Sequence, residues 1–326
     1  MVKTDFSKTN HLFLSFPKKF YNEYENLIPF YNELIELIPN DIHQFIITST
    51  NQIALEIKNR FSHKNLDTIV VRNWDEIWLR DCMGMVNGNQ IIKPIYFPNY
   101  CSVKQYWNYF KNLNKLTKQI IQDSLSHEIV DMPIIMDGGN FINNSSLAFI
   151  TDKIIKDNPG KKVVDLLSNY CGLKPILVKN NTYDTIGHID GYMSFKDEDT
   201  VFISKYPQLK AFQKDNEYSE YLNKTALDNN LQVVSIYDRP FNQIAKCGCE
   251  DNCDCFYTAK GTYINFLRLN DTVILPEYSI PKRMDDRGYN TVNEDTLTEN
   301  GFNVLKINCD DVAKFGGALH CLSWQI

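Results

Sequence analysis

The sequence predicts a single α/β domain, and three observations support this fold class. Short runs rich in β-branched and aromatic residues alternate with amphipathic helical stretches from one end of the 326-residue chain to the other. No tract rich in Pro, Gly or Ser and no low-complexity tract divides the chain. The composition is 43% hydrophobic, which is enough for a large buried core. We therefore expect residues 1–326 to form one domain.

The first elements follow one another closely. HLFLSF (11–16) is typical of a strand. FYNELIELI (30–38) places apolar residues at helical spacing and follows Pro29, a residue suited to the first turn of a helix. The strand HQFIITST (43–50), the helix QIALEIKNRF (52–61) and the strand TIVV (68–71) come next.

The same alternation continues to the last residues. Helices are predicted over 104–123, 161–171 and 206–229. Periodicity alone leaves open whether the strands form an open sheet, a closed sheet or separate blades. The predicted strands are IIKPIYF (91–97), DMPIIM (131–136), TVFISK (200–205), LQVVSIY (231–237), TYINFLRL (262–269), TVILP (272–276), NVLKI (303–307) and ALHCLSW (318–324).

Charge and composition disfavour several classes of function. The net charge is -6 and the pI is about 5.6, and Lys and Arg are scattered, so the chain offers no basic stripe for nucleic acid. No apolar run approaches the roughly 20 residues that span a bilayer, so we expect no membrane insertion. The polar start MVKTDFSKTN lacks the apolar core of a signal peptide, which predicts a cytoplasmic protein with mostly reduced cysteines.

One stretch departs from the rest of the chain in composition. Residues 246–256, KCGCEDNCDCF, hold four of the nine cysteines and are predicted to be a cysteine-rich loop insertion. Four thiolates so close are able to hold a tetrahedral Zn²⁺, but the C-x-C-x₃-C-x-C spacing is not the usual one and the flanking acids add negative charge. We favour an exposed loop without metal, and keep zinc as the alternative, with ligands Cys247, Cys249, Cys253 and Cys255.

Polar residues with catalytic potential gather at five places, each next to a predicted strand. Each motif alone has an ordinary structural explanation: a lone His-x-Asp is usually a hydrogen-bonded pair, a buried Cys an inert apolar residue, and Gly-Gly a turn. Together they supply a thiol, a base and several carboxylates. The motifs are WLRDCMG (78–84), MDGGN (136–140), GHIDGY (187–192), TYINF (262–266) and GGALHC (316–321).

The combination suggests covalent chemistry on a cation. A thiol becomes a nucleophile when a base or a lowered pKa favours the thiolate, and a His elsewhere in the sequence is the usual partner. Two carboxylates, Asp81 and Asp190, suit a planar guanidinium, because its paired N–H groups match carboxylate oxygens. The residues therefore point to a cationic, guanidine-like substrate.

The order of these motifs resembles the guanidino-group-modifying (pentein) superfamily, which includes agmatine deiminases, arginine deiminases, bacterial peptidylarginine deiminases and amidinotransferases. The set W-x-R-D-x-x-G, D-G-G-N, G-H-x-D, Y-x-N-F and G-G-x-x-H-C runs through nearly the whole chain, and HLFLSFP resembles the opening strand of agmatine-deiminase-like members. The resemblance implies a five-bladed α/β propeller of pseudo-repeated ββαβ-type units around a central polar cleft.

The resemblance also implies roles for individual residues. Cys321 matches the nucleophile, His188 the general acid and base, and Asp81 and Asp190 the carboxylates that bind the guanidinium. We expect Cys321 to lie on the terminal strand. The residues expected to line the substrate site are Trp78, Asp137, Asn140, Asn265 and Gly317.

Two departures from the agmatine deiminase pattern bear on the substrate. Met85 stands where a proline is usual, and Asp137 stands where a glutamate is usual, which is closer to the peptidylarginine branch. A substrate with an α-carboxylate would need a cation, for which Arg72, Lys93 and Lys104 are candidates, although each is more simply explained as a surface charge.

These expectations define the predicted function. The chain is expected to be a hydrolase that releases ammonia from agmatine or a related small guanidino compound through an amidino-cysteine intermediate. It would need no metal or organic cofactor. The alternatives are an arginine or peptidyl-arginine deiminase, an amidinotransferase and a catalytically silent guanidine-binding module, and a homodimer is left open.

Overall fold

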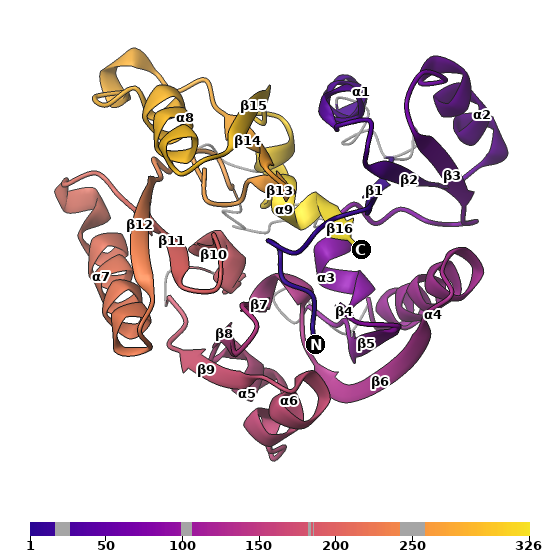
Figure 1. Ribbon diagram of the computed structural model, residues 1–326, viewed down its shortest axis with the longest axis horizontal. Coiled ribbons are helices and arrows are strands. Elements are labelled where there is room, and N and C mark those ends of the chain that lie inside the picture. Colours follow the sequence, from indigo (N-terminus) through magenta and orange to yellow (C-terminus); the bar gives the residue numbers. More distant parts are fainter. Residues whose placement is uncertain (17–26, 99–105, 182–183, 185, 242–257) are drawn as a thin grey trace.

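The computed structural model describes residues 1–16, 27–98, 106–181, 184, 186–241 and 258–326. Within these ranges, five small sheets stand around a common centre, and most of the longer helices lie on the outer rim (Figure 1). Successive sheets along the chain are neighbours in the ring. The predicted five-bladed α/β propeller is therefore confirmed.

Four of the five sheets repeat one arrangement of three strands. The first strand, nearest the centre of the ring, pairs antiparallel with the second, and the second pairs parallel with the third. These sheets are β4 (Met85–Asn87), β5 (Gln90–Ile95) and β6 (Glu128–Ile135); β7 (Ile142–Asn143), β8 (Leu147–Thr151) and β9 (Lys174–Val178); β10 (Met193–Phe195), β11 (Thr200–Lys205) and β12 (Gln232–Tyr237); and β13 (Leu267–Leu269), β14 (Thr272–Glu277) and β15 (Asn303–Asn308).

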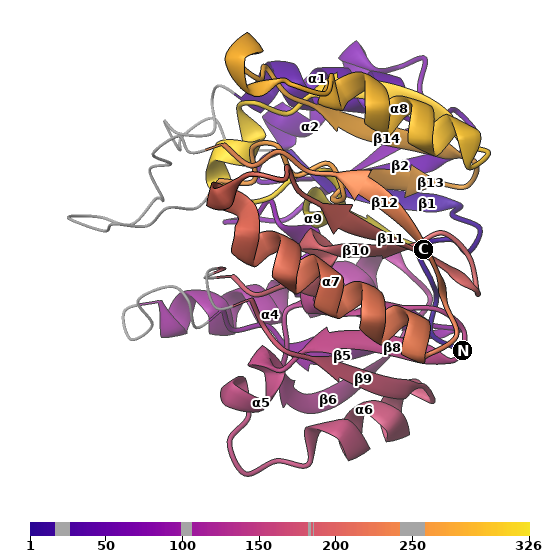
Figure 2. The same ribbon diagram turned by 90° about the vertical axis from the view of Figure 1, so that its left-hand side faces the viewer.

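Helices form the crossovers between the parallel strands. A parallel pair needs a long connection, and in each blade a helix provides it, so the repeated ββαβ unit is confirmed as predicted. The long helix α7 runs beside its own sheet in the side view (Figure 2). The crossover helices are α1 (Ile28–Leu37), α2 (Asn51–Arg60), α4 (Trp107–Ser124), α5 (Lys153–Asp157), α6 (Val163–Cys171), α7 (Gln213–Asp228) and α8 (Tyr289–Glu299), and two crossovers also contain the short 3₁₀ turns η4 (Lys210–Phe212) and η5 (Lys282–Met284). A further 3₁₀ turn, η6 (Val312–Phe315), follows β15.

The middle strands are covered on both faces, which explains their sequences. In β8, β11 and β14, nearly every residue is buried, including residues that point to opposite faces of the sheet. Such strands read as continuous apolar runs rather than as alternating patterns. Their burial makes them the rigid frame that carries the inner strands.

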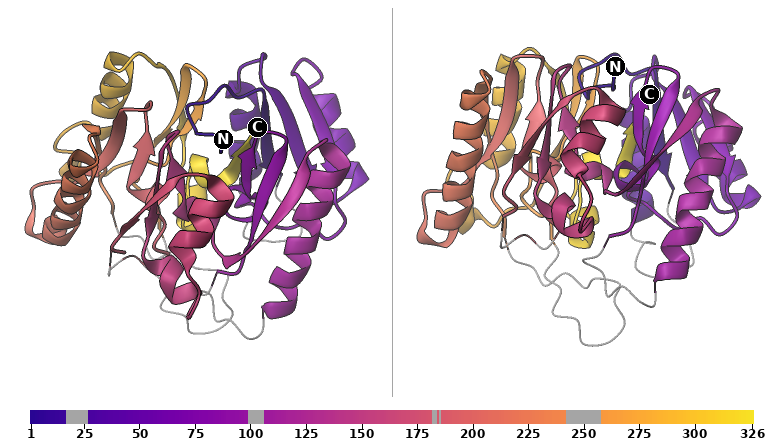
Figure 3. Two further views of the ribbon diagram at one scale, coloured as in Figure 1. Left: turned by 60° about the horizontal axis from the view of Figure 1, so that its bottom comes forward. Right: turned by 90° about the horizontal axis from the view of Figure 1, so that it is seen from below.

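The first sheet joins both ends of the chain and closes the ring. Here β16 (Ser323–Gln325) pairs antiparallel with β1 (His11–Ser15), which continues in parallel to β2 (His43–Thr48) and β3 (Leu66–Val70). Phe13 and Trp324 lie opposite each other, with ring centroids 5.1 Å apart in an edge-to-face arrangement. The two termini consequently lie near the same end of the molecule (Figure 3).

Three predicted elements were wrong in their extent. In 318–324, only the end is strand, because Leu319–Leu322 form the short helix α9; in 262–269, only Leu267–Leu269 pair as a strand. The helix predicted from residue 206 begins at Gln213, since a turn in which the N–H of Leu209 bonds the carbonyl of Pro207 precedes it. A short apolar run does not distinguish a strand from a helical turn, because it is too short for the two periodicities to differ.

Two further sequence predictions meet limits in the structure. None of the helices in the described ranges combines the length and the apolar character needed to cross a membrane. The predicted loop insertion 246–256 lies outside the described residues, and with it the alternative zinc ligands Cys247, Cys249, Cys253 and Cys255. The described cysteines are all free thiols: Cys82, Cys171, Cys309 and Cys321.

Candidate active site

The segments that immediately precede the inner strands carry the predicted site residues. Because the inner strands surround the centre of the ring, the short turns that lead into them meet there (Figure 1). Five such segments converge, one from each blade. They are α3 (Leu79–Met83) before β4, the 3₁₀ turns η2 (Gly138–Asn140) before β7 and η3 (Ile189–Gly191) before β10, the loop 262–266 before β13, and α9 before β16.

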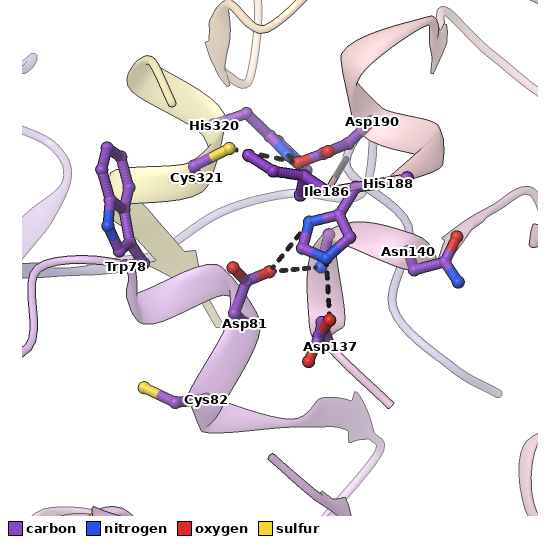
Figure 4. A network of polar contacts seen from close by, with 12 residues as sticks. Trp78, Asp81, Cys82, Asp137, Asn140, Ile186, His188, Asp190, His320 and Cys321 are labelled. Atoms are coloured by element: carbon purple, nitrogen blue, oxygen red, sulfur yellow. Dashed lines mark hydrogen bonds and ion pairs between the residues drawn. The ribbon is translucent and has the colours of Figure 1, made fainter. Parts of the chain in front are cut away.

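His188 lies in the middle of a group of carboxylates (Figure 4). Its Nε2 is 2.9 Å from Asp137 Oδ2, and its Nδ1 is 3.6 Å from Asp81 Oδ1. Burial disfavours the imidazolium, but the negative charges of Asp81, Asp137 and Asp190 outweigh it and raise the pKa of His188 to about 9. At neutral pH this imidazole therefore holds a proton that it is able to donate.

Asp137 connects His188 to a buried lysine. Lys153 Nζ lies 3.0 Å from the same Oδ2 atom that contacts His188. Burial opposes ionisation of Asp137, yet the partners His188 and Lys153 lower the pKa of this carboxyl. Asp137 is thus an ionised carboxylate with a positive partner on two sides, and it fixes the orientation of the imidazole ring.

The two carboxylates of the predicted clamp have different environments. The backbone N–H of Gly139 donates to Asp81 Oδ1 at 2.9 Å, but burial and the neighbouring carboxylates raise the pKa of Asp81 to about 6. Asp190 Oδ2 is 2.7 Å from Nδ1 of His320, and this contact lowers the pKa of Asp190 although burial opposes it. Without a substrate, the site concentrates negative charge, and a cation would relieve it.

Cys321 is half-buried on α9, beside Asp190. Its Sγ lies 3.6 Å from Asp190 Oδ2. Burial raises the pKa of the Cys321 thiol well above its usual range, and the charges of Asp190 and Asp81 add to this effect. The empty site therefore favours the protonated thiol. The predicted place on the terminal strand was wrong, because Cys321 lies on the helical turn before β16.

Asn265 holds that helical turn in place. Its Oδ1 accepts hydrogen bonds from the backbone N–H of Ala318 and of Cys321, each at 3.3 Å. Its Nδ2 donates to the backbone carbonyl of Asp190 at 3.3 Å. This amide thus ties the segment of Cys321 to that of Asp190, while its contact with a substrate stays a prediction.

The other predicted residues occupy distinct places. Asn140 Oδ1 accepts from the backbone N–H of Thr151 at 3.0 Å, and the side chain points away from Cys321 (Figure 4). The ring of Trp78 packs over Gly317, where an added Cβ would approach its Cζ3 to 2.4 Å. The absence of a side chain at Gly317 therefore leaves room for the indole ring of Trp78. The roles of Asn140, Trp78 and Gly317 toward a substrate remain predictions.

The Gly-Gly pair of η2 is required by close approach. An added Cβ at Gly138 would lie 2.0 Å from the backbone oxygen of Arg80, and one at Gly139 would lie 2.8 Å from His188 Nδ1 and 2.9 Å from Asp81 Oδ1. Side chains at these positions do not fit without displacing the cluster.

Gly139→Ala is expected to reduce activity more than stability. The methyl group would separate His188 from Asp81, and a misplacement of about 1 Å at reacting groups costs on the order of 10²-fold in rate. Gly88→Asn is the control, because nothing lies near its Cβ position and its φ of 59° suits asparagine. The measurement is kcat/KM beside the melting temperature, and wild-type kcat/KM in Gly139→Ala would contradict the prediction.

A cavity of about 250 Å³ opens beside the cluster. Of the predicted residues, His188, Asp190, Asn265, Gly317 and Cys321 line it. Its lining also includes two tyrosines and two further carboxylates that the sequence analysis missed: Tyr192, Tyr206, Asp184 and Asp215.

The residues that the sequence analysis missed differ in how visible they were in the sequence. His320 stands next to Cys321 in the last motif, and Asp184 only four residues before His188, so both were close to recognised motifs. Asp215 lies on α7 and Lys153 on α5, where an acid or a lysine is ordinarily a surface charge. Asp5, which contacts His320, is more than 300 positions away from it and left no signal.

Neither Arg72 nor Lys93, two of the three candidate cations for an α-carboxylate, lines the cavity. Arg72 is exposed and Lys104 lies outside the described residues. Lys93 was expected at the surface and is instead buried, with its Nζ bonded to the carbonyl of Pro94 and to Asn114 Oδ1. Burial lowers the pKa of Lys93 to about 8. Among the described residues that line the cavity, none is Lys or Arg.

Comparisons with known proteins give a family match by sequence and further matches by fold. The family model described as Porphyromonas-type peptidyl-arginine deiminase matches residues 1–326. A search of curated proteins finds no match. The fold matches C. jejuni agmatine deiminase (15% identity, TM-score 0.76, covering 100% of this chain and 96% of the other) and agmatine deiminase of Enterococcus faecalis (15%, 0.76, 99% and 94%). A more distant match is DDAH from Pseudomonas aeruginosa, at 11% identity and a TM-score of 0.51 over 98% of this chain and 100% of that one.

Proposed function

The chain belongs to the Porphyromonas-type peptidyl-arginine deiminase family, and on that premise we propose that it is a C–N hydrolase that releases ammonia from a small guanidino compound. One observation carries the proposal: Cys321, Asp190 and His188 line one cavity, beside a buried group of carboxylates that raises the pKa of His188. A nucleophile, a proton donor and anionic groups for a cation are the parts that this reaction requires.

The proposed reaction has two covalent steps. Asp81 and Asp190 accept hydrogen bonds from the guanidinium and hold its carbon at about 3 to 3.5 Å from the Cys321 sulfur. The bound cation favours loss of the thiol proton to solvent, the thiolate adds to the carbon, and His188 gives its proton to the departing nitrogen. Ammonia leaves and an amidino group remains on the sulfur. Water then adds with His188 as base, the C–S bond breaks, and a ureido product and the thiol result.

The cavity beside the cluster favours a substrate with a second positive charge. Asp184 and Asp215 line it beside Tyr192, whose hydroxyl donates to Asp184 Oδ2 at 3.0 Å. Burial raises the pKa of Asp215, so a cation close to it would be favourable. Agmatine carries a guanidinium at one end and an ammonium at the other. We therefore propose agmatine or a close relative as substrate, ahead of free arginine and then of peptidyl arginine.

Asp215→Asn tests this assignment. We expect kcat/KM for agmatine to fall about tenfold to a hundredfold, because a hydrogen bond to a charged group contributes roughly 1.5 to 3 kcal/mol. Butylguanidine has the same guanidinium and chain without the ammonium, so its kcat/KM should hardly change. Equal losses for both compounds would show that Asp215 does not recognise the second charge.

A panel of guanidino compounds tests the function as a whole. Agmatine, arginine, a blocked arginyl peptide and butylguanidine are each assayed for ammonia and for the ureido product under one set of conditions. If the peptide exceeds agmatine tenfold in kcat/KM, about 1.4 kcal/mol in transition-state binding, the small-molecule assignment is wrong while the chemistry stands.

The same panel separates the rival reactions. In an amidinotransferase, the alkylamine of the substrate and not ammonia would leave in the first step, and an added amine would then resolve the amidino intermediate in place of water. Turnover would therefore need the added amine and would release no ammonia. A silent binding module would bind the compounds and produce neither ammonia nor a ureido product. Either result would overturn the hydrolase proposal.

A further inference from the structure

The N-terminal segment crosses the centre of the ring before β1 begins (Figure 1). It is held along its length: Val2 forms a β-bridge with Asn87, the N–H of Lys3 donates to the carbonyl of Val86 at 2.7 Å, and the N–H of Thr9 donates to Asn270 at 2.8 Å. These contacts place Asp5 directly behind the active-site cluster.

A line of alternating charges leads from this segment to the nucleophile. Arg80 Nη2 lies 3.3 Å from Asp5 Oδ1, and Asp5 Oδ2 lies 3.3 Å from His320 Nε2. His320 Nδ1 lies 2.7 Å from Asp190 Oδ2, which is the atom that contacts the Cys321 sulfur. The side chains of Arg80, Asp5 and His320 are largely buried, with exposed fractions between about a tenth and a fifth.

We infer that Asp5 is a positioning residue of the active site, which acts through His320 to keep Asp190 ionised and oriented toward the guanidinium. The inference rests on the proposed function of Asp190 as a guanidinium-binding carboxylate. Asp5 itself touches neither the substrate cavity nor the sulfur in this arrangement.

The need for such a residue follows from the crowding of charge around Asp190. Asp190 is buried near two other carboxylates, Asp81 and Asp137, and burial with like charges ordinarily favours the protonated, neutral acid. A neutral Asp190 would bind a guanidinium poorly. An imidazolium at His320, with both ring N–H groups donating to carboxylates, removes this difficulty.

The charges around His320 come from three elements. Burial and the nearby Arg80 of α3 disfavour its imidazolium, whereas Asp5 and Asp190 of η3 raise the pKa of His320 above its ordinary value. Asp5 in turn has Arg80, His320 and Arg268 of β13 around it, and together they lower its pKa although burial opposes this. Lys3 of the same segment also lies within electrostatic reach of Asp5. Asp5 thus supplies one of the two negative charges that keep His320 protonated.

Asp5→Asn is the central test, because asparagine keeps the shape and removes the charge. Without that charge, His320 gives up its proton at a lower pH, so kcat/KM should begin its alkaline decline earlier and approach the wild-type value as the pH falls. A fall of one pKa unit in His320 lowers its protonated fraction about tenfold above that pKa, and kcat/KM there should fall to a similar extent. Asp5→Glu, which restores the charge, should recover most of the loss.

Ser7→Ala is the matched control in the same segment. The Ser7 hydroxyl forms a hydrogen bond with the Thr4 hydroxyl, so this variant perturbs the segment without removing a charge. Its pH profile should equal that of the wild type. If Asp5→Asn lowers the melting temperature but leaves the pH profile of kcat/KM unchanged, Asp5 has a structural role only and the inference is overturned.

Two readouts keep this test separate from the proposed function. The titration of His320 by NMR needs no substrate, so a lower pKa of His320 in Asp5→Asn supports the link even if the wild type hydrolyses no guanidine, and an unchanged pKa overturns it. In Asp5→Ala, added formate should partly restore the titration of His320, since a cavity of about 40 Å³ lined by Asp5 and Arg80 adjoins the missing carboxylate. Chloride at equal ionic strength should not.

Discussion

Replacing Cys321 by serine is expected to abolish turnover and to leave substrate binding nearly intact. A hydroxyl is a much weaker nucleophile than a thiolate toward the carbon of a guanidinium, and no other group in the described cluster replaces the sulfur. We expect kcat to fall about 10⁴-fold or more, since a nucleophile that acts with its partners as one unit carries most of the rate. The carboxylates Asp81 and Asp190 remain, so calorimetry should still detect binding of agmatine.

Cys82→Ala is the matched control. Cys82 is a fully buried thiol on α3, next to Asp81 in the chain, and it points away from His188 and Cys321 (Figure 4). The Cys82→Ala variant should therefore retain a kcat close to that of the wild type.

A second experiment looks for the intermediate directly. When wild-type protein is acid-quenched during turnover, mass spectrometry should find the amidino adduct on the peptide that contains Cys321. Near-normal turnover in Cys321→Ser would remove Cys321 from the mechanism.

Asp190→Asn is expected to have the next largest effect. The substitution keeps the shape of the side chain but removes the charge that would pair with the guanidinium and that holds the His320 ring at 2.7 Å. Truncating one partner of a buried charge pair costs about 2 to 5 kcal/mol. That corresponds to roughly thirtyfold to several thousandfold in kcat/KM. Asp81→Asn should reduce kcat/KM less than Asp190→Asn does, because a carboxyl with a pKa of about 6 is already partly neutral near that pH.

The binding step separates the two contributions of Asp190. In a Cys321→Ser background, Asp190→Asn should weaken binding of agmatine, which measures its share in holding the cation. Asp131→Asn serves as the control, since Asp131 is an exposed carboxylate paired with Lys118 on the rim. If Asp81→Asn and Asp190→Asn both leave kcat/KM unchanged, these carboxylates do not form the guanidinium clamp.

The sequence predicted most of the fold because its signals are local. Apolar runs such as TVFIS and TVILP are continuous since the middle strands are covered on both faces, and the helices between them show the spacing of a half-buried surface. The propeller itself came from the resemblance of five ordered motifs and not from periodicity, which does not distinguish an open sheet from separate blades.

The motifs were readable because each lies directly before an inner strand. Glycines at such places are required by contacts that no side chain permits, as at Gly138 against the backbone of Arg80. The nature of the cluster, a thiol with a base and carboxylates, could therefore be predicted from residue types. The distances within the cluster and the raised pKa of His188 depend on carboxylates from three blades. No local sequence pattern predicts that these carboxylates lie close together.

The sequence by itself thus predicted the α/β class and the motifs that meet in the cluster, since each depends on neighbours within a few positions, while the roles of the residues in those motifs stay predictions. The tertiary structure alone decided that Cys321 lies on a helical turn held by Asn265, that Asp184 and Asp215 share its cavity, and that Asp5 reaches His320. The physical reason is the closure of the ring: pairing of β16 with β1 brings the two ends of the chain together at its centre. Contacts made by that closure join residues more than 300 positions apart, and no periodic pattern encodes them.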